Sequence, residues 1–88
     1  MPHRIFWKVL LMSDQLTKGE RFIWNWQYRR LGGFASSLID AIRRADEHNR
    51  ERLRRGFPDE VSAYEQFSHT SGWWDKVQRK AERLGFTF

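Results

Sequence analysis

Residues 33–74 read GFASSLIDAIRRADEHNRERLRRGFPDEVSAYEQFSHTSGWW, and the spacing of apolar side chains in this stretch decides the fold. In its first third these side chains recur at the helical period, at Phe34, Leu38, Ile39, Ile42 and Ala45. Charged residues occupy most of the opposite face, so the pattern predicts an amphipathic helix. Gly32 and Gly33 precede the run and mark where this helix begins.

Two breaks divide the following residues into further short helices. Asp46 can accept a hydrogen bond from a free backbone N–H group, which predicts a bend or a helix restart there. Gly56 follows a basic segment and is expected to end that helix as a C-terminal glycine. Pro58 suits the first turn of the next helix, where its missing N–H group costs nothing. We expect Phe57, between these two breaks, to be buried where the helices meet.

Two more helices are predicted after Pro58. Their apolar stripes are Val61, Tyr64 and Phe67 in the first helix, and Trp74, Val77, Ala81 and Leu84 in the second. Residues 68–72 read SHTSG and predict the turn between the two helices. Ser71 is expected to cap the last helix, and Gly85 is expected to end it.

The segment before this stretch supports two interpretations. Thr17 and Glu20 match a capping box, which predicts a helix over the residues that follow. Residues 22–28 also place an aromatic side chain at every second position, which predicts a strand that could pair with residues 5–11 as a hairpin. The sequence leaves the choice between helix and strand open here.

Length and composition limit the fold to one small domain, residues 1–88, with residues 1–12 as a variable N-terminal extension. The chain has no Cys, which excludes disulfide and thiolate–metal frameworks, while seven Phe and five Trp supply large side chains for a core. No apolar run approaches the roughly 20 residues of a membrane span. We therefore expect a compact all-α domain of four or five short helices, cytoplasmic in location, with a strand or hairpin as the alternative for its N-terminal arm.

The sequence contains no recognisable catalytic or metal-binding pattern. His3, His48 and His69 are scattered and lack the spacing of metal ligands. Ser36 and Ser37 lack the context of a nucleophile elbow, and no glycine loop is present to cradle a phosphate. We therefore expect a protein that is not an enzyme and that uses neither a metal nor a cofactor.

Arginine dominates the positive charge. The net charge is +5, and twelve of the sixteen cationic residues are Arg, which favours planar contacts with carboxylate or phosphate. Six of them cluster within thirteen residues, at Arg43, Arg44, Arg50, Arg52, Arg54 and Arg55. The cluster is either a surface for phosphate or acidic groups, or a solvated helix face on which Glu47 and Glu51 pair with arginines three or four positions away. Arg43, Arg44 and Arg52 have the fewest acidic neighbours.

The tryptophans are divided between core and surface. Trp73 and Trp74 are adjacent and cannot both face one core from the same helix, so one of them is expected at the surface. We predict Trp26 and Trp74 in the core, with Trp24 and Trp73 at an interface. Together with the arginines, the predicted partner-binding residues are Trp24, Arg29, Arg30, Arg43, Arg44, Arg52, Arg55 and Trp73.

Several short motifs resemble small proteins that bacteriophages and prophages commonly encode. The motifs are Trp24-Asn25-Trp26, Gly33-Phe34, Ala41-Ile42 with Ala45-Asp46 and Asn49, Gly56-Phe57-Pro58-Asp59-Glu60-Val61, and Gly72-Trp73-Trp74. The resemblance covers about residues 22–74 and implies a phage-derived accessory protein in the cytoplasm of a bacterial host. Such proteins often act by binding, for example as inhibitors of host defence systems, including anti-CRISPR proteins. No catalytic residue carries over from this resemblance.

We therefore predict a non-enzymatic accessory protein that binds a host protein or nucleoprotein complex and inhibits a bacterial defence system. The alternative is a basic helical nucleic-acid-binding domain with Arg43, Arg44, Arg52 and Arg55 on phosphates. A third interpretation is a virion or structural protein that self-associates through an aromatic face, which would make a homodimer one of the alternatives. No membrane partner is expected.

Overall fold

The computed structural model describes residues 15–86, and five α-helices account for most of this range. In chain order they are α2 (Lys18–Gln27), α3 (Gly33–Arg44), α4 (Glu47–Gly56), α5 (Pro58–His69) and α6 (Trp73–Arg83). No residue in the described range belongs to a strand, which confirms the predicted all-α fold of short helices. The predicted extension at residues 1–12 and the strand considered at residues 5–11 lie outside the described residues.

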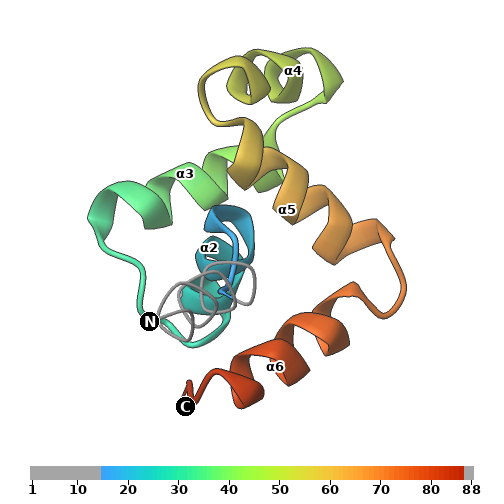
Figure 1. The fold of residues 1–88 in the computed structure, drawn as a ribbon. Helices are drawn as coiled ribbons and strands as arrows, with labels where there is room; N and C mark the ends of the chain where they lie inside the picture. Colours follow the sequence, from blue (N-terminus) through green and yellow to red (C-terminus); the bar gives the residue numbers. More distant parts are fainter. Residues whose placement is uncertain (1–14, 87–88) are drawn as a thin grey trace, which may run out of the picture.

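Helix α2 lies at the centre of the molecule, and α4 and α6 lie at opposite ends of it (Figure 1). It begins at the predicted capping box. The Thr17 hydroxyl accepts from the Glu20 N–H group at 3.1 Å, and the Glu20 carboxylate accepts from the Thr17 N–H group at 2.8 Å. Phe22, Ile23 and Trp24 are consecutive and all buried, because neighbouring elements cover α2 on several sides. The segment is therefore a helix. Its aromatic residues also match the alternation of a strand because this helix is covered on more than one face.

Two hydrophobic clusters meet at α2. The larger cluster lies between α2, α3 and α5, and its buried members are Phe22, Ile23, Leu38, Ile39, Ile42, Val61 and Ala63. The smaller cluster joins α2 to α6 through Leu16, Trp24, Val77 and Ala81. The predicted stripes of α3, α5 and α6 thus supply core residues. Phe34 is an exception: it is 71% exposed in the first turn of α3, where its ring centroid lies 5.9 Å from that of Phe57.

Helices α2 and α5 are in close contact at Gly19. A Cβ atom on Gly19 would lie 2.7 Å from the Asp59 carbonyl oxygen and 2.8 Å from the Ala63 Cβ atom. Both distances are shorter than van der Waals contact, so the crossing requires glycine. On another side of α2, an ion pair of 2.9 Å between Glu20 and Lys80 joins it to α6.

The end of α4 differs from the prediction. Gly56 is the last helical residue and does not adopt the left-handed conformation of a C-terminal glycine. The chain leaves the helix at Phe57, with φ −135° and ψ 60°, because the residue before a proline is disfavoured in the α conformation. Pro58 therefore stops α4 as well as starting α5. Phe57 is half-buried against the larger cluster rather than fully buried as predicted.

The turn between α5 and α6 is shorter than predicted. Ser68 and His69 belong to α5 instead of the turn. Gly72 caps α6 in place of Ser71, and its φ of 82° is a left-handed conformation that glycine adopts without steric cost. Gly85 ends the α6 segment with the same φ, as predicted. None of the helices in residues 15–86 is long and apolar enough to cross a membrane.

Candidate functional site

The six clustered arginines have different roles in the structure, and Arg50 is a structural one. Helix α4 has no fully buried residue; its half-buried Leu53 packs against the larger cluster, and polar side chains add to its attachment. The Arg50 guanidinium donates to the backbone carbonyls of Ile42 at 3.4 Å and Ala45 at 3.2 Å, at the end of α3. It also lies 5.9 Å from the centre of the Tyr64 ring on α5. Arg50 therefore fixes α4 to both of its neighbours.

Arg54 joins α4 to α5 through a bidentate ion pair. Two of its guanidinium nitrogens donate to the two carboxylate oxygens of Glu65, at 2.6 Å and 2.7 Å. Its Nε atom donates to Glu51 at 3.0 Å, which is one of the pairs predicted for a solvated helix face. The hydrogen bonds from Arg54 lower the pKa of Glu65 below its ordinary value and outweigh the opposite effect of partial burial. Arg54 is thus a second structural arginine.

Arg44 and Arg52 line one hollow between α3 and α4, which we call the α3–α4 hollow. Its lining residues are Ala41, Arg44, Ala45, Asn49, Arg52 and Leu53, and its volume is about 550 Å³. Both arginines are exposed, and neither takes part in an ion pair or side-chain hydrogen bond within residues 15–86. The hollow therefore brings together two guanidinium groups that have no acidic partner in the described part of the chain.

The two helices contribute to the α3–α4 hollow with the same spacing. The lining positions have the spacing i, i+3 and i+4 in both segments, with Ala41 and Arg44 on α3 and Ala45 as the residue that caps its end, and Asn49, Arg52 and Leu53 on α4. Positions at this spacing share one helix face, so each helix directs one arginine toward the hollow. Sequence reasoning singled out both arginines but missed the apolar residues between them. The repeated spacing on two consecutive helices is the signal that could have identified the hollow.

Two other predicted arginines of the cluster lie outside the hollow. Arg43 pairs with Asp40 at 3.3 Å, and its guanidinium carbon lies 5.6 Å from the centre of the Trp26 ring. Consecutive residues of a helix point in different directions, so Arg43 does not accompany Arg44. Arg55 is exposed near the end of α4 and has no ion pair within residues 15–86.

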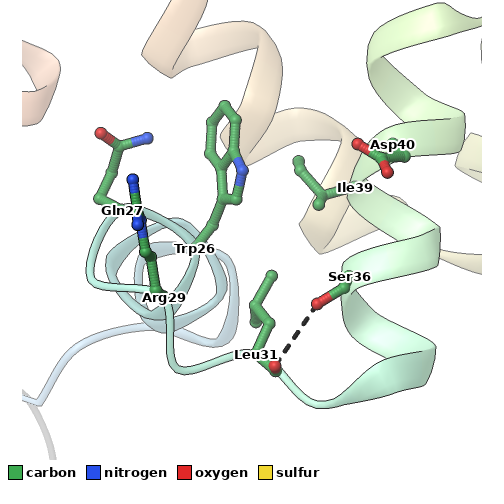
Figure 2. Close-up of a pocket in the computed structure, with 7 residues that line it drawn as sticks. All are labelled: Trp26, Gln27, Arg29, Leu31, Ser36, Ile39 and Asp40. Carbon is green, nitrogen blue, oxygen red and sulfur yellow. Dashed lines mark hydrogen bonds between the residues drawn. The ribbon is translucent and has the colours of Figure 1, made fainter.

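A second hollow lies between the end of α2 and helix α3. Its lining residues are Trp26, Gln27, Arg29, Leu31, Ser36, Ile39 and Asp40. Figure 2 shows the Trp26 ring between Arg29 on the α2 side and Asp40 on the α3 side. The Ser36 hydroxyl donates to the Leu31 carbonyl at 3.4 Å, and neither histidine nor cysteine lines the hollow. This arrangement does not place an activating base beside a nucleophile, so it gives no support to covalent catalysis.

Arg29 and Arg30 lie in the turn that ends α2. Arg29 has a φ of 57°, an uncommon conformation for a residue other than glycine. Its N–H group donates to the Trp26 carbonyl at 3.2 Å, and that of Arg30 donates to the Asn25 carbonyl at 2.7 Å. Both side chains are exposed and form no ion pair within residues 15–86. This turn thus presents two cations away from the α3–α4 hollow.

The structure contradicts the predicted place of Trp24 at an interface, while Trp26 packs against the larger cluster as expected of a core residue. Trp24 is only 1% exposed and belongs to the smaller cluster, so it is not on the surface, whereas Trp26 is half-buried. Trp73 and Trp74 are both half-buried, and each packs against both clusters. Adjacent side chains can both contact the core here because α6 faces two clusters instead of one. Trp73 keeps an exposed part, and Trp24 does not.

No group of three His, Asp or Glu side chains in residues 15–86 is arranged to hold a metal ion. In residues 15–86, the α3–α4 hollow is lined by two exposed guanidinium groups that have no acidic partner. Among known proteins, no family model, no curated sequence and no solved structure matches the chain.

Proposed function

We propose that this chain is a non-enzymatic binding protein that engages an anionic region of a host macromolecule through the α3–α4 hollow. The observation that carries the proposal is the pair Arg44 and Arg52: two exposed guanidinium groups from two helices share one hollow without an acidic partner in the described residues. Guanidinium groups are weakly hydrated and form planar contacts with carboxylate and phosphate. Two of them at one hollow therefore favour an anionic ligand.

The structural arginines support this proposal because they hold the hollow in one shape. Arg50 ties α4 to the end of α3, and Arg54 ties it to α5. A binding surface that is already ordered loses less conformational entropy when its partner arrives. The sequence thus uses some arginines to position α4 and leaves others free on the same pair of helices.

The biological setting that we propose comes from the sequence resemblance to phage and prophage accessory proteins. An inhibitor of a bacterial defence system needs no catalytic group, because covering a surface that its target uses is enough to block the target. A small binding protein with a preformed cationic hollow meets this requirement. In this proposal the partner is a host protein or nucleoprotein complex.

A second candidate function is nucleic-acid binding, and the exposed arginines outside the hollow favour it. Arg29, Arg30 and Arg55 form no ion pair within residues 15–86, and the full chain carries a net charge of +5. A protein that neutralises several phosphates loses affinity steeply as salt increases. The logarithm of its binding constant falls linearly with the logarithm of the salt concentration, with a slope of about −0.9 for each phosphate contacted. A gel-shift titration at several salt concentrations measures this slope directly.

Affinity capture from a bacterial lysate, followed by mass spectrometry, tests the proposed function. The variant R44E/R52E reverses the charge at the hollow, and R21E/K76E is the matched control on α2 and α6, where both residues are exposed. We expect the parent and the control to recover the same partner and R44E/R52E to lose it. Nuclease treatment spares the capture of a protein partner and abolishes capture through nucleic acid. A partner that R44E/R52E still recovers would place the binding surface elsewhere.

A further inference from the structure

The lining of the α3–α4 hollow combines apolar and cationic side chains. Ala45 and Leu53 are half-buried, and Ala41 adds a methyl group on the same side of α3. Arg44 and Arg52 are more exposed, and their aliphatic stems extend the apolar lining beneath the charged groups. A ligand that fits this hollow has an apolar group for its more buried part and anionic groups for its two arginines.

Three acidic residues near the hollow are engaged with other groups. Asp46 caps α4 by accepting from the Asn49 N–H group at 2.8 Å. Glu51 accepts from Arg54 at 3.0 Å, and Asp40 pairs with Arg43. Glu47, exposed in the first turn of α4, forms no ion pair within residues 15–86, so none of these four carboxylates pairs with Arg44 or Arg52. The charge that complements the two arginines is therefore expected from a partner.

Several features of the hollow favour a protein partner over nucleic acid. No aromatic side chain lines it, so it offers no platform for stacking a base. In the described structure, Arg44, Arg52 and Arg55 are the arginines of α3 and α4 that lack an ion pair or a carbonyl contact, whereas a nucleic-acid surface usually neutralises a longer row of phosphates. A phosphodiester backbone places only a sugar between its charges, whereas a peptide can place a large apolar side chain there.

We infer that the α3–α4 hollow binds an acidic protein segment in which an apolar side chain enters beside Ala45 and Leu53. Carboxylates that flank this side chain reach Arg44 and Arg52. The inference rests on the proposed function, because it names the partner of the same surface. Arg50 acts as a positioning residue in this site, since its bonds to the end of α3 set the orientation of α4 without lining the hollow.

A random-peptide display library, selected on the parent protein and counter-selected on R44A/R52A, provides the probe for this inference. We expect the enriched peptides to carry an apolar residue between aspartates or glutamates. Each enriched peptide is then synthesised with a fluorescent label and titrated by anisotropy against the parent and its variants. A labelled single-stranded oligonucleotide and a labelled duplex are titrated in parallel.

The variant A41R separates the two kinds of ligand. Ala41 is exposed on α3, and arginine has a high helix propensity, so the helix is expected to stay intact and circular dichroism checks this. The new side chain fills the apolar part of the hollow but adds a positive charge. We expect it to weaken binding of the enriched peptides by about tenfold or more, as R44A/R52A does, while it strengthens any purely electrostatic ligand. The control R21A/K76A removes two exposed charges elsewhere and is expected to change peptide affinity little.

The outcomes distinguish the inference from the proposed function. Peptides enriched for acidic residues without an apolar preference would overturn the inference, and so would stronger peptide binding by A41R. Oligonucleotide binding that depends on Arg44 and Arg52, with no peptide enriched, would also overturn it while leaving the hollow as the binding surface. If neither peptide nor oligonucleotide binding depends on these arginines, the proposed function fails as well.

Discussion

Helices α2 and α4 have similar lengths but are held in the molecule by different physical means. Helix α2 is covered by neighbouring elements, and Ile23 and Trp24 at its centre are 0% and 1% exposed. Helix α4 has no fully buried residue; half-buried Leu53 packs against the larger cluster, and Arg50 and Arg54 bond α4 to carbonyl and carboxylate groups. Apolar burial therefore provides most of the stability around α2, whereas α4 and the hollow beside it depend more on polar contacts. The core around α2 and the proposed binding region beside α4 are therefore different parts of the molecule, and variants in each region test this difference.

The largest effect is expected for Trp24→Ala. This change removes a nearly fully buried indole that contacts Tyr28, Trp74 and Phe86 with ring centroids 4.5–5.8 Å away. Truncating a buried aromatic residue to alanine costs about 3–5 kcal/mol, a large share of the stability of a small domain. We therefore expect a strong fall in the melting temperature, measured by circular dichroism. A variant that melts like the parent but loses its partner would restore Trp24 as an interface residue.

A smaller loss is expected for Gly19→Ala at the crossing of α2 and α5. The new methyl group would meet the Asp59 carbonyl oxygen at 2.7 Å, a backbone atom that cannot rotate away. Overpacking of this kind typically costs about 1–3 kcal/mol, and the better helix propensity of alanine offsets up to about 1 kcal/mol of that. Gly33→Ala is the matched control, because nothing lies within 4 Å of its Cβ position and its φ is not positive. Denaturant unfolding should show a loss for the first variant and no loss for the control.

The helices could be predicted from local sequence patterns. The comparison of α2 with α4 shows which features such patterns do not predict. The period of α3 and the capping box of α2 are local signals, and the structure confirms both. The burial of Trp24 depends on two clusters meeting at α2, which no local pattern contains. Arg44 and Arg50 are chemically identical, and only the atoms within reach of each guanidinium separate the free arginine from the structural one. The candidate site was therefore predicted in its charges and missed in its shape.

An intermediate and local effect is expected for Arg54→Ala. The change removes the bidentate bond to Glu65 and the bond to Glu51, while every member of both core clusters stays in place. Because α4 has no buried residue, it should open locally without unfolding of α2. Hydrogen exchange should accelerate at the α4 amides and change little at those of α2. Equal acceleration in both helices would mean that α4 belongs to the same cooperative unit as the core.

The acid dependence of stability should differ between the two helices in the same way. Burial raises the pKa of Glu20, but the hydrogen bond from the Thr17 N–H group and the contacts with Lys80 outweigh it and lower the pKa below its ordinary value of 4.5. The pKa of Glu65 is also below its ordinary value, chiefly because of its hydrogen bonds from Arg54. A carboxylate with a lowered pKa stabilises the fold above its unfolded pKa, and this contribution is lost as pH falls through the folded pKa.

The stabilising contributions of Glu20 and Glu65 are therefore present near neutral pH. They disappear progressively below about pH 4.5, the ordinary pKa of a glutamate side chain. We expect Glu20→Gln to reduce the acid dependence of the melting temperature of the whole domain. Glu65→Gln should instead reduce the acid dependence of hydrogen exchange in α4. An unchanged acid transition in both variants would mean that other carboxylates control it.

The smallest effect on stability is expected for R44A/R52A, the variant with the largest expected effect on binding. Both side chains are exposed and lack an acidic partner in the described residues, so their removal breaks no ion pair there. Surface substitutions of this type usually change the free energy of unfolding by less than about 0.5 kcal/mol. The sign should be slightly stabilising at low salt, because alanine has the highest helix propensity and because fewer like charges remain on the arginine-rich helices. The electrostatic part of this gain should disappear at high salt.

Thermal melts of the parent, R44A/R52A and Arg54→Ala at two salt concentrations measure the size, the sign and the salt dependence of the change in stability. If R44A/R52A lowers the melting temperature as much as Arg54→Ala does, the two arginines also hold α4 in place, and the α3–α4 hollow is not a free cationic site.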